Sequence, residues 1–324
     1  MAIITNTFTK YNVVGLREDL NNLIANISPE ETPFVTNITK RRNVTNTFFE
    51  FQTDSLSNAA ANAHIDGDDL GTSFSAITPT VRLGNYTQIL RKDFIVADNL
   101  AGSLDTAGRR SEIAYQLAKH GKELRRDQEL NLCGVNQAAV AGNNTTARKT
   151  ASLSAFIKTN TSKGTGGADP TVSSGVVNAA RTDGTQRSIS EAMLKDIIQS
   201  CWTEGGSPTM LMVGAFNKRA ISAFAGIAAQ RYMAPSDGPT QIVGAADVYQ
   251  SDFGSISIIP NRFSRSRDAY LLDPDLIEIA QLRPMQSTEL SKTGDATKYM
   301  MLMEMGLQVN QEAGLGIIAD LTTS

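Results

Sequence analysis

The stretch SNAAANAHIDGDDLGTSFSA, residues Ser57–Ala76, separates two segments that have the composition of β-strands. Residues 44–53 before it are rich in threonine and aromatic side chains, and residues 80–97 after it are also predicted to form a strand. The residues between them show no periodic apolar face, and so long a connection without one is uncommon inside a compact domain and is usually functional. The pattern predicts a long two-stranded excursion with Ser57–Ala76 at its tip.

The excursion is acidic, whereas the segment just before it is basic. From Asn43 to Val81 there is no lysine or arginine, and the acidic residues are Glu50, Asp54, Asp66, Asp68 and Asp69. The basic run consists of Lys40, Arg41 and Arg42. Opposite charges on two such segments favour contacts between copies of the chain, since interlocking subunits use heterologous, charge-complementary contacts. We therefore expect the inter-subunit contacts to include Lys40, Arg41, Arg42, Asp66, Asp68 and Asp69.

Three aspartates near one glycine also suggest a calcium loop. With Asp66 at the first ligand position of an EF-hand, Asp68 takes the third, but Leu70 stands at the fifth and Ile77 at the twelfth, where a bidentate glutamate is required. An irregular metal site that uses His64 with Asp66, Asp68 and Asp69 is the alternative. A solvated acidic loop fits the spacing better, so we expect no metal ligands here.

Composition argues against several other classes of protein. The 324 residues contain 30 Lys and Arg against 33 Asp and Glu, a net charge of −3, which gives no general attraction to nucleic acid or anionic membranes. The N-terminus lacks the features of a signal peptide, and no apolar run approaches the roughly 20 residues of a membrane helix. We expect synthesis in a cytoplasm, no membrane association, and two cysteines, Cys133 and Cys201, that serve as small core residues.

No pattern of catalytic residues stands out. His64 and His120 are the only histidines, and neither has the spacing of a metal ligand or lies near a cysteine in the sequence. A G-x-S-x-G nucleophile elbow is absent from the sequence. We expect no catalytic residue and no cofactor, with His120 on the solvated face of a helix.

The N-terminal half contains an arm and one long helix. Residues 15–27 place Leu16, Leu20, Leu23, Ile24 and Ile27 at helical spacing, and prolines 29 and 33 follow, so this short amphipathic segment is predicted to lie on another surface as an arm. Residues 105–133 lack proline and carry a narrow apolar stripe, which predicts a helix over a sheet that stops near Gly134. The stripe consists of Ile113, Leu117, Leu124 and Leu130.

Residues 135–187 are rich in Ala, Gly, Asn, Ser and Thr and include SKGTGGADP, Ser162–Pro170. A glycine-rich stretch can cradle a phosphate, but these glycines neither follow a clear strand nor open a clear helix. We therefore favour a loop insertion.

The remaining residues predict a mixed α/β domain. Ser188 and Glu191 suggest a capping box for a helix whose apolar face holds Leu194, Ile197, Ile198, Cys201 and Trp202. A strand TMLMV, a second helix that ends at Gly226, and strands at DVYQS, SISIIP, AYLLD and LIEIAQL follow, which indicates several antiparallel pairs. The last strand, YMMLMEMGLQVNQ, places Met301, Met303, Met305, Leu307 and Val309 on one face and Glu304, Gln308 and Asn310 on the other.

The order of these elements resembles that of the major capsid proteins of tailed phages, which share the Hong Kong 97-type fold. Local sequence is similar to this family in ISPEETPFVTNI (residues 27–38) and RRSEIAYQLAKHGKELRRDQE (109–129), and at the C-terminus in IIPNRF, AYLLDPDLIEIAQLRP and ELSKTGDATKYMMLMEMGLQVNQEAGLGIIADL. The similarity spans nearly the whole chain, although its motifs consist of ordinary residues and contain no catalytic signature.

The resemblance implies an α+β fold of five parts. These are an N-terminal arm (1–42), an extended β-hairpin loop (43–98), a peripheral domain with a spine helix (99–133), a mainly axial domain that includes the Gly/Ser/Thr-rich insertion at about 135–187 (134–280), and C-terminal strands of the peripheral domain (281–324). It implies a structural virion protein that self-assembles as hexamers and pentamers into an icosahedral or prolate head around double-stranded DNA, without sequence-specific DNA binding. An encapsulin-type compartment, which encloses protein, is the near alternative.

Two features of the sequence distinguish it from parts of that family. No long charged coiled-coil segment precedes the arm, so we expect a separate scaffolding protein, together with a portal, with or without a decoration protein. From Asn43 to Arg91 there is no lysine. The Lys–Asn isopeptide cross-link that the resemblance would suggest therefore has no donor in the loop, and we expect the shell to be held by non-covalent overlaps of arm and loop.

Overall fold

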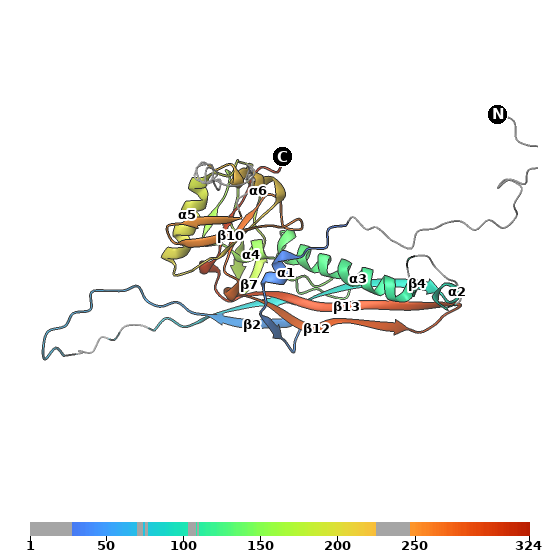
Figure 1. Cartoon of the computed structure of the whole chain (residues 1–324). Coiled ribbons are helices and arrows are strands. Elements are labelled where there is room, and N and C mark those ends of the chain that lie inside the picture. The colour runs from blue at the N-terminus through green and yellow to red at the C-terminus, as the bar shows by residue number, and fades with distance from the viewer. Residues whose placement is uncertain (1–27, 70–73, 75–76, 103–107, 109, 225–246) are drawn as a thin grey trace, which may run out of the picture.

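The computed structural model describes residues 28–69, 74, 77–102, 108, 110–224 and 247–324 (Figure 1). The arm helix predicted within residues 15–27 lies outside these residues. The helix predicted to end at Gly226 ends earlier, at Ser222. The described chain forms a long, flat base, a globular head that stands on one side of it, and a hairpin that projects beyond the base (Figure 1).

The base is a four-stranded sheet with strand order β1-β12-β13-β4. Its central pair is antiparallel, β4 pairs antiparallel with the other edge of β13, and β1 runs parallel to the start of β12. The bounds are β1 Arg41–Asn43, β12 Ile277–Leu290, β13 Ala296–Val309 and β4 Gln88–Ala97. A short helix, α2 (Asp98–Gly102), follows β4 at the far end of the base.

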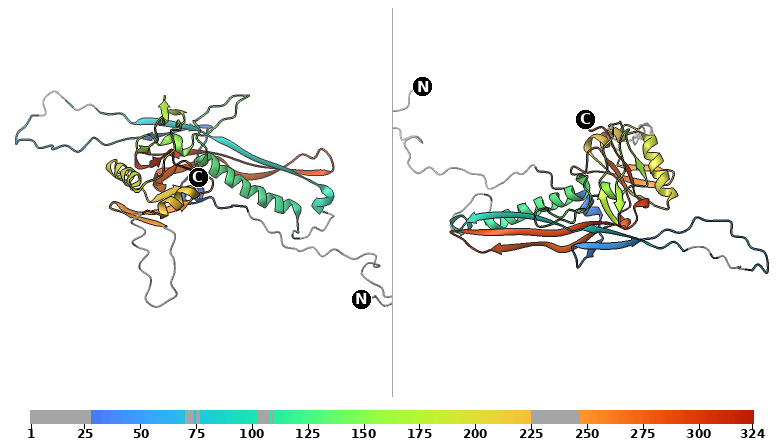
Figure 2. Two further views of the ribbon diagram at one scale, coloured as in Figure 1. Left: turned by 90° about the horizontal axis from the view of Figure 1, so that it is seen from above. Right: turned by 180° about the vertical axis from the view of Figure 1, so that it is seen from behind.

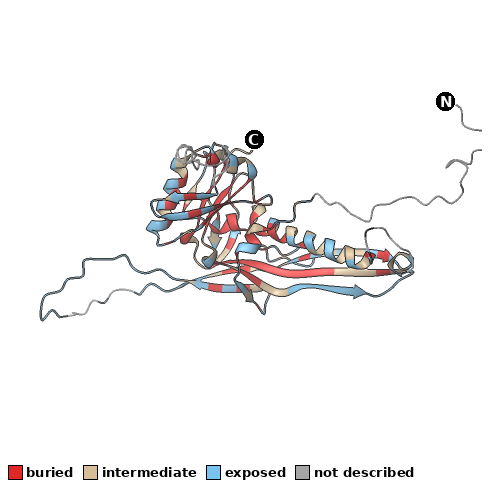
Figure 3. Ribbon diagram, viewed as in Figure 1, coloured by how far each residue is buried: buried red, intermediate tan, exposed pale blue. Residues whose placement is uncertain are grey.

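The strand β13 confirms the predicted methionine face, but its opposite face is buried too (Figure 3). Met301, Met303 and Met305 belong to the main core. Glu304, on the polar face, accepts hydrogen bonds from the Thr87 hydroxyl at 2.7 Å, Arg148 Nη2 at 2.6 Å and Arg283 Nε at 2.8 Å. A buried carboxylate needs such partners because its desolvation is costly.

The long helix α3 (Glu112–Glu129) lies over this sheet against β4 and β13, as its narrow stripe predicted (Figures 1 and 2). It begins at Glu112 and not near residue 105, because the Ser111 side chain accepts a hydrogen bond from the Ala114 N–H at 3.4 Å and caps it. A π-helical turn, η2 (Leu130–Gly134), ends it at the predicted glycine.

Two side chains of this helix differ from prediction. Leu124 is fully buried, but Leu130 is 41% exposed because 3.6 residues per turn place position 130 away from the face of Ile113, Leu117 and Leu124. His120 is not on a solvated face: its ring stacks on Phe94 with 5.1 Å between centroids, and its Nδ1 lies 2.8 Å from Glu123 Oε2. Burial of the imidazole against Phe94 depends on β4, which the helix pattern alone does not reveal.

The head contains a six-stranded mixed sheet with order β5-β14-β11-β8-β10-β9, as the predicted mixed α/β domain requires. Its strands are β5 Thr161–Ser162, β14 Gly316–Ile318, β11 Ala269–Leu272, β8 Met210–Val213, β10 Gly254–Pro260 and β9 Val248–Ser251. Successive side chains of β8 enter two different cores, since Leu211 and Val213 pack with the head helices whereas Met210 and Met212 pack with the main core. This strand therefore joins the head to the base.

The helices of the head are α5 (Glu191–Thr203) and α6 (Ala215–Ser222). The capping box predicted at Ser188 is wrong: Ser190 caps α5, and its hydroxyl accepts a hydrogen bond from the Met193 N–H at 3.4 Å. Leu194, Ile197, Ile198 and Cys201 are buried as predicted. Trp202 is instead 58% exposed, where it packs against Phe253 with 5.2 Å between ring centroids.

A third sheet, with order β2-β3-β7-β6, carries the hairpin. Its strands are β2 Phe48–Thr53, β3 Val81–Tyr86, β7 Val176–Ala179 and β6 Thr171–Ser173. The prediction of a single strand over residues 80–97 is wrong. The segment forms two strands, since β3 ends just before Thr87 and β4 begins just after it. The break occurs because β3 pairs with β2, β4 pairs with β13, and the Thr87 hydroxyl bonds the buried Glu304.

The remaining short elements connect these layers. They are α1 Pro33–Asn37, α4 Leu153–Phe156, η3 Pro274–Leu276 and η4 Glu312–Gly314. Residues 151–157 are buried in or beside the main core, so this part of the predicted loop insertion is wrong. Small side chains there allow close packing, which composition alone does not distinguish from a surface loop.

The glycine-rich stretch Ser162–Pro170 wraps around a carboxylate of the protein itself. Asp320, which is buried, accepts hydrogen bonds from the Gly164 N–H at 3.0 Å, the Gly184 N–H at 2.8 Å and Arg267 Nη2 at 3.0 Å. A Cβ on Gly164 would lie 2.0 Å from the Thr185 carbonyl oxygen, so only glycine allows this approach. The Asp320 carboxylate therefore occupies the position where a phosphate would bind, and the structure does not support phosphate binding by this stretch.

The same region contains a network of arginines and aspartates. Asp183 forms ion pairs with Arg265 and with Arg267 Nη1, the latter at 3.3 Å. The hydrogen bond from Arg265 lowers the pKa of Asp183 below its usual value, while partial burial opposes this shift. The stabilisation from such a carboxylate is complete above its unfolded pKa, about 3.9, and is lost as the pH falls through the lower folded pKa.

We expect Asp183→Asn to lower the melting temperature at neutral pH and to have a diminishing effect below about pH 4. Thermal unfolding of both proteins across this range measures it, with Asp196→Asn on the exposed face of α5 as a control for the loss of one charge. A melting-temperature difference that stays constant into strong acid would contradict the assignment.

A second prediction concerns α1. Phe34 and Ile38 are fully buried in the main core, and truncation of a core phenylalanine to alanine typically costs about 3–5 kcal/mol. We expect Phe34→Ala to destabilise the unassembled subunit by this amount in denaturant unfolding. Phe74→Ala, on the exposed hairpin, is the control and should leave unfolding unchanged; equal effects would show that α1 is not part of the folded unit.

Candidate inter-subunit surfaces

The hairpin leaves the third sheet after Thr53 and returns at Val81. Its described residues between these points form no strand pairing, and all are exposed (Figure 3). Four large apolar side chains are among them: Leu56 (97% exposed), Ile65 (80%), Phe74 (77%) and Ile77 (92%). Exposed apolar residues concentrated on one projection mark an interaction site.

At the tip, a tight turn presents an apolar and an acidic side chain together. The Asp68 N–H donates to the Ile65 carbonyl at 3.1 Å, and Gly67 has φ +83°, a value that favours glycine. The Asp68 carboxylate lies 2.8 Å from His64 Nδ1, so it is engaged locally. Asp66, between Ile65 and Gly67, makes no ion pair with a described residue.

The predicted basic run lies at the start of β1, in the middle of the base, and each residue has a partner within the chain. Lys40 Nζ pairs with Asp275 Oδ1 at 3.1 Å. Arg42 Nη1 donates to Gln308 Oε1 at 2.8 Å. Arg41 Nη2 donates to the Val35 carbonyl at 2.8 Å and has no carboxylate partner among the described residues. The acidic tip and the basic run are therefore not brought together within one chain (Figure 1).

Sequence reasoning missed the residue that anchors the segment before β1. Glu129, fully buried at the end of α3, accepts hydrogen bonds from the Phe34 N–H at 2.7 Å, the Val35 N–H at 2.8 Å and the Asn261 side chain at 2.6 Å. Burial raises the pKa of Glu129, although these three donors favour the charged form. On sequence alone this glutamate looks like any solvated charge of a helix.

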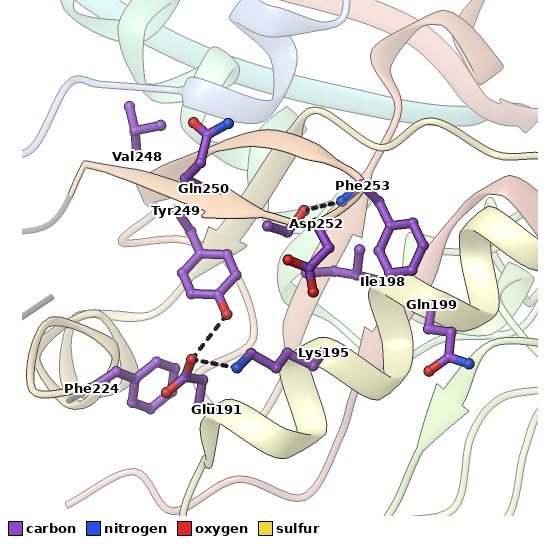
Figure 4. A pocket seen from close by; sticks show the side chains of 11 residues that line it. Glu191, Lys195, Ile198, Gln199, Phe224, Val248, Tyr249, Gln250, Asp252 and Phe253 are labelled. Carbon is purple, nitrogen blue, oxygen red and sulfur yellow. Dashed lines mark hydrogen bonds and ion pairs between the residues drawn. The ribbon is translucent and has the colours of Figure 1, made fainter. Parts of the chain in front are cut away.

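A cavity of about 490 Å³ lies between α5 and the β9–β10 hairpin (Figure 4). Inside it, Lys195 Nζ lies 2.9 Å from Glu191 Oε1, and the Tyr249 hydroxyl donates to the same oxygen at 3.2 Å. The hydrogen bond from Lys195 lowers the pKa of Glu191, and burial raises the pKa of Tyr249. The ion pair thus holds the Glu191 carboxylate in its charged form.

The remaining candidates from the sequence are the two cysteines, a metal site and a membrane-spanning helix. Cys133 and Cys201 are both buried, and burial raises the pKa of the Cys201 thiol to about 12. Across the part of the chain that the structure describes, no cluster of three or more His, Cys, Asp or Glu side chains is arranged to hold a metal ion. No helix within the same residues has the length and apolar character needed to cross a bilayer.

Comparisons with known proteins identify the family of this chain. The model of the family described as SU10 major capsid protein matches residues 3–322. The major capsid protein of Escherichia phage Phieco32 is 29% identical, over 96% of this chain and 96% of that protein.

Solved structures share the fold at much lower identity. The cyanophage A-1(L) capsid subunit has a TM-score of 0.67 at 13% identity and covers 99% of this chain and 100% of its own. The SrpI encapsulin of Synechococcus elongatus has a TM-score of 0.55 at 9% identity, with 96% of this chain and 98% of its own covered, and is a relative in fold only. The fold is the predicted Hong Kong 97-type fold, and the chain belongs to the SU10 major capsid protein family.

Proposed function

We propose that copies of this chain form the head shell of a tailed phage and are held together without covalent links, through overlap of the hairpin and the N-terminal segment with neighbouring subunits. The observation that carries this proposal is the projecting hairpin, whose apolar side chains have no cover in their own subunit. Many such weak contacts, repeated over a closed assembly, sum to a stable shell.

Within this proposal the five parts have distinct places. Residues 1–42 are the arm and 43–98 the extended loop, although β4 within that range pairs in the long sheet. Residues 99–133 contain the spine helix of the peripheral domain, 134–280 form mainly the axial domain, and 281–324 return to the peripheral domain. The axial domains meet at the centres of hexamers and pentamers.

The remaining partners follow from the same proposal. A separate scaffolding protein directs assembly in the host cytoplasm, a portal occupies one vertex, and a decoration protein is compatible with the exposed surface. Double-stranded DNA lies against the inner surface without sequence-specific contacts. A net charge of −3 supports this, because a mildly acidic chain has no general attraction to the phosphate backbone.

We also propose that the chain has no enzymatic activity. In the cavity of Figure 4 the ion pair with Lys195 lowers the pKa of Glu191 and keeps the carboxylate charged, whereas a general acid or base needs a pKa near the working pH. An encapsulin-like role, with protein inside the shell, rests only on the shared fold.

Removal of the hairpin tests the proposal. We expect replacement of residues 55–79 by a short Gly-Ser turn to leave a folded subunit that forms no shells, because the described residues of this range are exposed and take no part in its core. The triple variant Leu56→Ser, Ile65→Ser, Ile77→Ser keeps the length and should lower shell yield strongly. Electron microscopy and size-exclusion chromatography measure both, and normal shells from the deletion variant would refute the role of the hairpin.

The non-covalent character of the shell is tested separately. Because the loop contains no lysine from Asn43 to Arg91, we expect shells boiled in detergent to migrate as a single band of monomer mass, with or without reductant. Both cysteines are free and buried in the folded chain, so no disulfide between subunits is expected and the reductant should make no difference. A ladder of covalent oligomers in purified mature particles would contradict this prediction.

A further inference from the structure

A cavity of about 150 Å³ opens between α1, α3 and the long sheet, and two arginines lie beside it. Its apolar floor is formed by Met285, Met303 and Met305, and its polar rim by Arg41, Arg125 and Gln128. The volume is well above the roughly 10–15 Å³ that a single water needs, so it admits a small side chain. Met285 is 40% exposed, which leaves the floor open to the outside.

The rim carries positive charge that nothing in the described part of the chain neutralises. Arg41 donates only to backbone carbonyls, those of Val35, Ile38 and Lys40, and neither arginine pairs with a described carboxylate. Burial, and then the nearby charge of Arg125, lowers the pKa of Arg41. Two guanidinium groups that repel each other beside an open cavity favour an anion between them.

The hairpin tip has the complementary chemistry. Its turn presents the apolar Ile65 next to the acidic Asp66, and the excursion contains no lysine or arginine from Asn43 to Val81. In Figure 1 the hairpin points away from the base where α1 and α3 lie, so its tip does not reach the cavity of its own chain. The matching surfaces belong to different copies.

We propose that the cavity receives the hairpin tip of a second copy, with the Asp66 carboxylate between Arg41 and Arg125 and Ile65 on the methionine floor. This inference rests on the proposed shell function and refines it. Of the basic run predicted to contact another subunit, only Arg41 binds the hairpin tip, and Arg125, which the sequence analysis did not single out, binds it as well. Methionine suits such a floor because its flexible side chain adapts to the group that enters.

Charge reversal tests the pairing. Arg125→Glu and Asp66→Lys should each raise the protein concentration needed for assembly at low salt about tenfold, an effect of about 1.4 kcal/mol per contact, and less in high salt because exposed charges are then screened. The double variant should recover assembly. Lys119→Glu, exposed on the same helix, and Asp54→Lys, on the same hairpin, change charge equally and should have little effect. Melting temperatures of the unassembled variants verify that each one folds.

A disulfide experiment tests contact independently of assembly yield. When Ile65→Cys and Met285→Cys proteins are assembled together and oxidised, a disulfide-linked dimer should form, whereas Ile65→Cys with Lys119→Cys should give none. The two native cysteines are buried and add no background.

The outcomes separate the two proposals. If wild-type protein forms shells while both reversals assemble normally and no dimer forms, the cavity assignment is wrong and the shell function stands. Arg125→Glu shells that assemble normally but retain less DNA would identify phosphate as the occupant and also overturn it. If wild-type protein forms no shell with its scaffold under any condition, both proposals fail.

Discussion

The hairpin between Thr53 and Val81 carries exposed apolar side chains that need another surface to cover them. Much of the remaining fold holds the base of this hairpin in place. Burial of Leu56, Ile65, Phe74 and Ile77 requires another surface, because the described hairpin residues make no core of their own. The base of the hairpin is rigid by contrast, since β2 and β3 pair along their whole length and continue into a sheet with β7 and β6. A stiff base with an uncovered end favours association, because only the end must become ordered on contact.

Three buried carboxylates tie the elements behind the hairpin together. Glu129 joins α1, α3 and the segment after β10; Glu304 joins β13, the break at Thr87, and two arginines; Asp320 holds the glycine-rich stretch. Each accepts several hydrogen bonds from residues far apart in the sequence. Removal of any one would leave unpaired donors in a dry interior, which is costly. These hydrogen-bonded carboxylates fix how the head, the base and the N-terminal segment lie relative to one another.

The comparison with capsid proteins and an encapsulin shows how little of the sequence this architecture requires. At 9–13% identity, the cyanophage capsid and the encapsulin share the fold across nearly the whole chain. Such a fold can be kept at low identity, since a core tolerates many apolar combinations of suitable volume.

Period and composition alone determined the mixed α/β domain, the long helix over a sheet, the methionine face of β13 and the uncovered excursion, because each depends on residues close in sequence. They did not determine the break at Thr87, the burial of Glu129 and Glu304, or the filled cradle at Asp320. Nor did they identify Arg125, which lies on the exposed side of α3 like any solvated charge. Such features depend on partners 90 to 220 residues away, such as Phe34 with Glu129 or Thr87 with Glu304. Only the tertiary structure brings these groups together, and a buried charge can be recognised only once its partners are known.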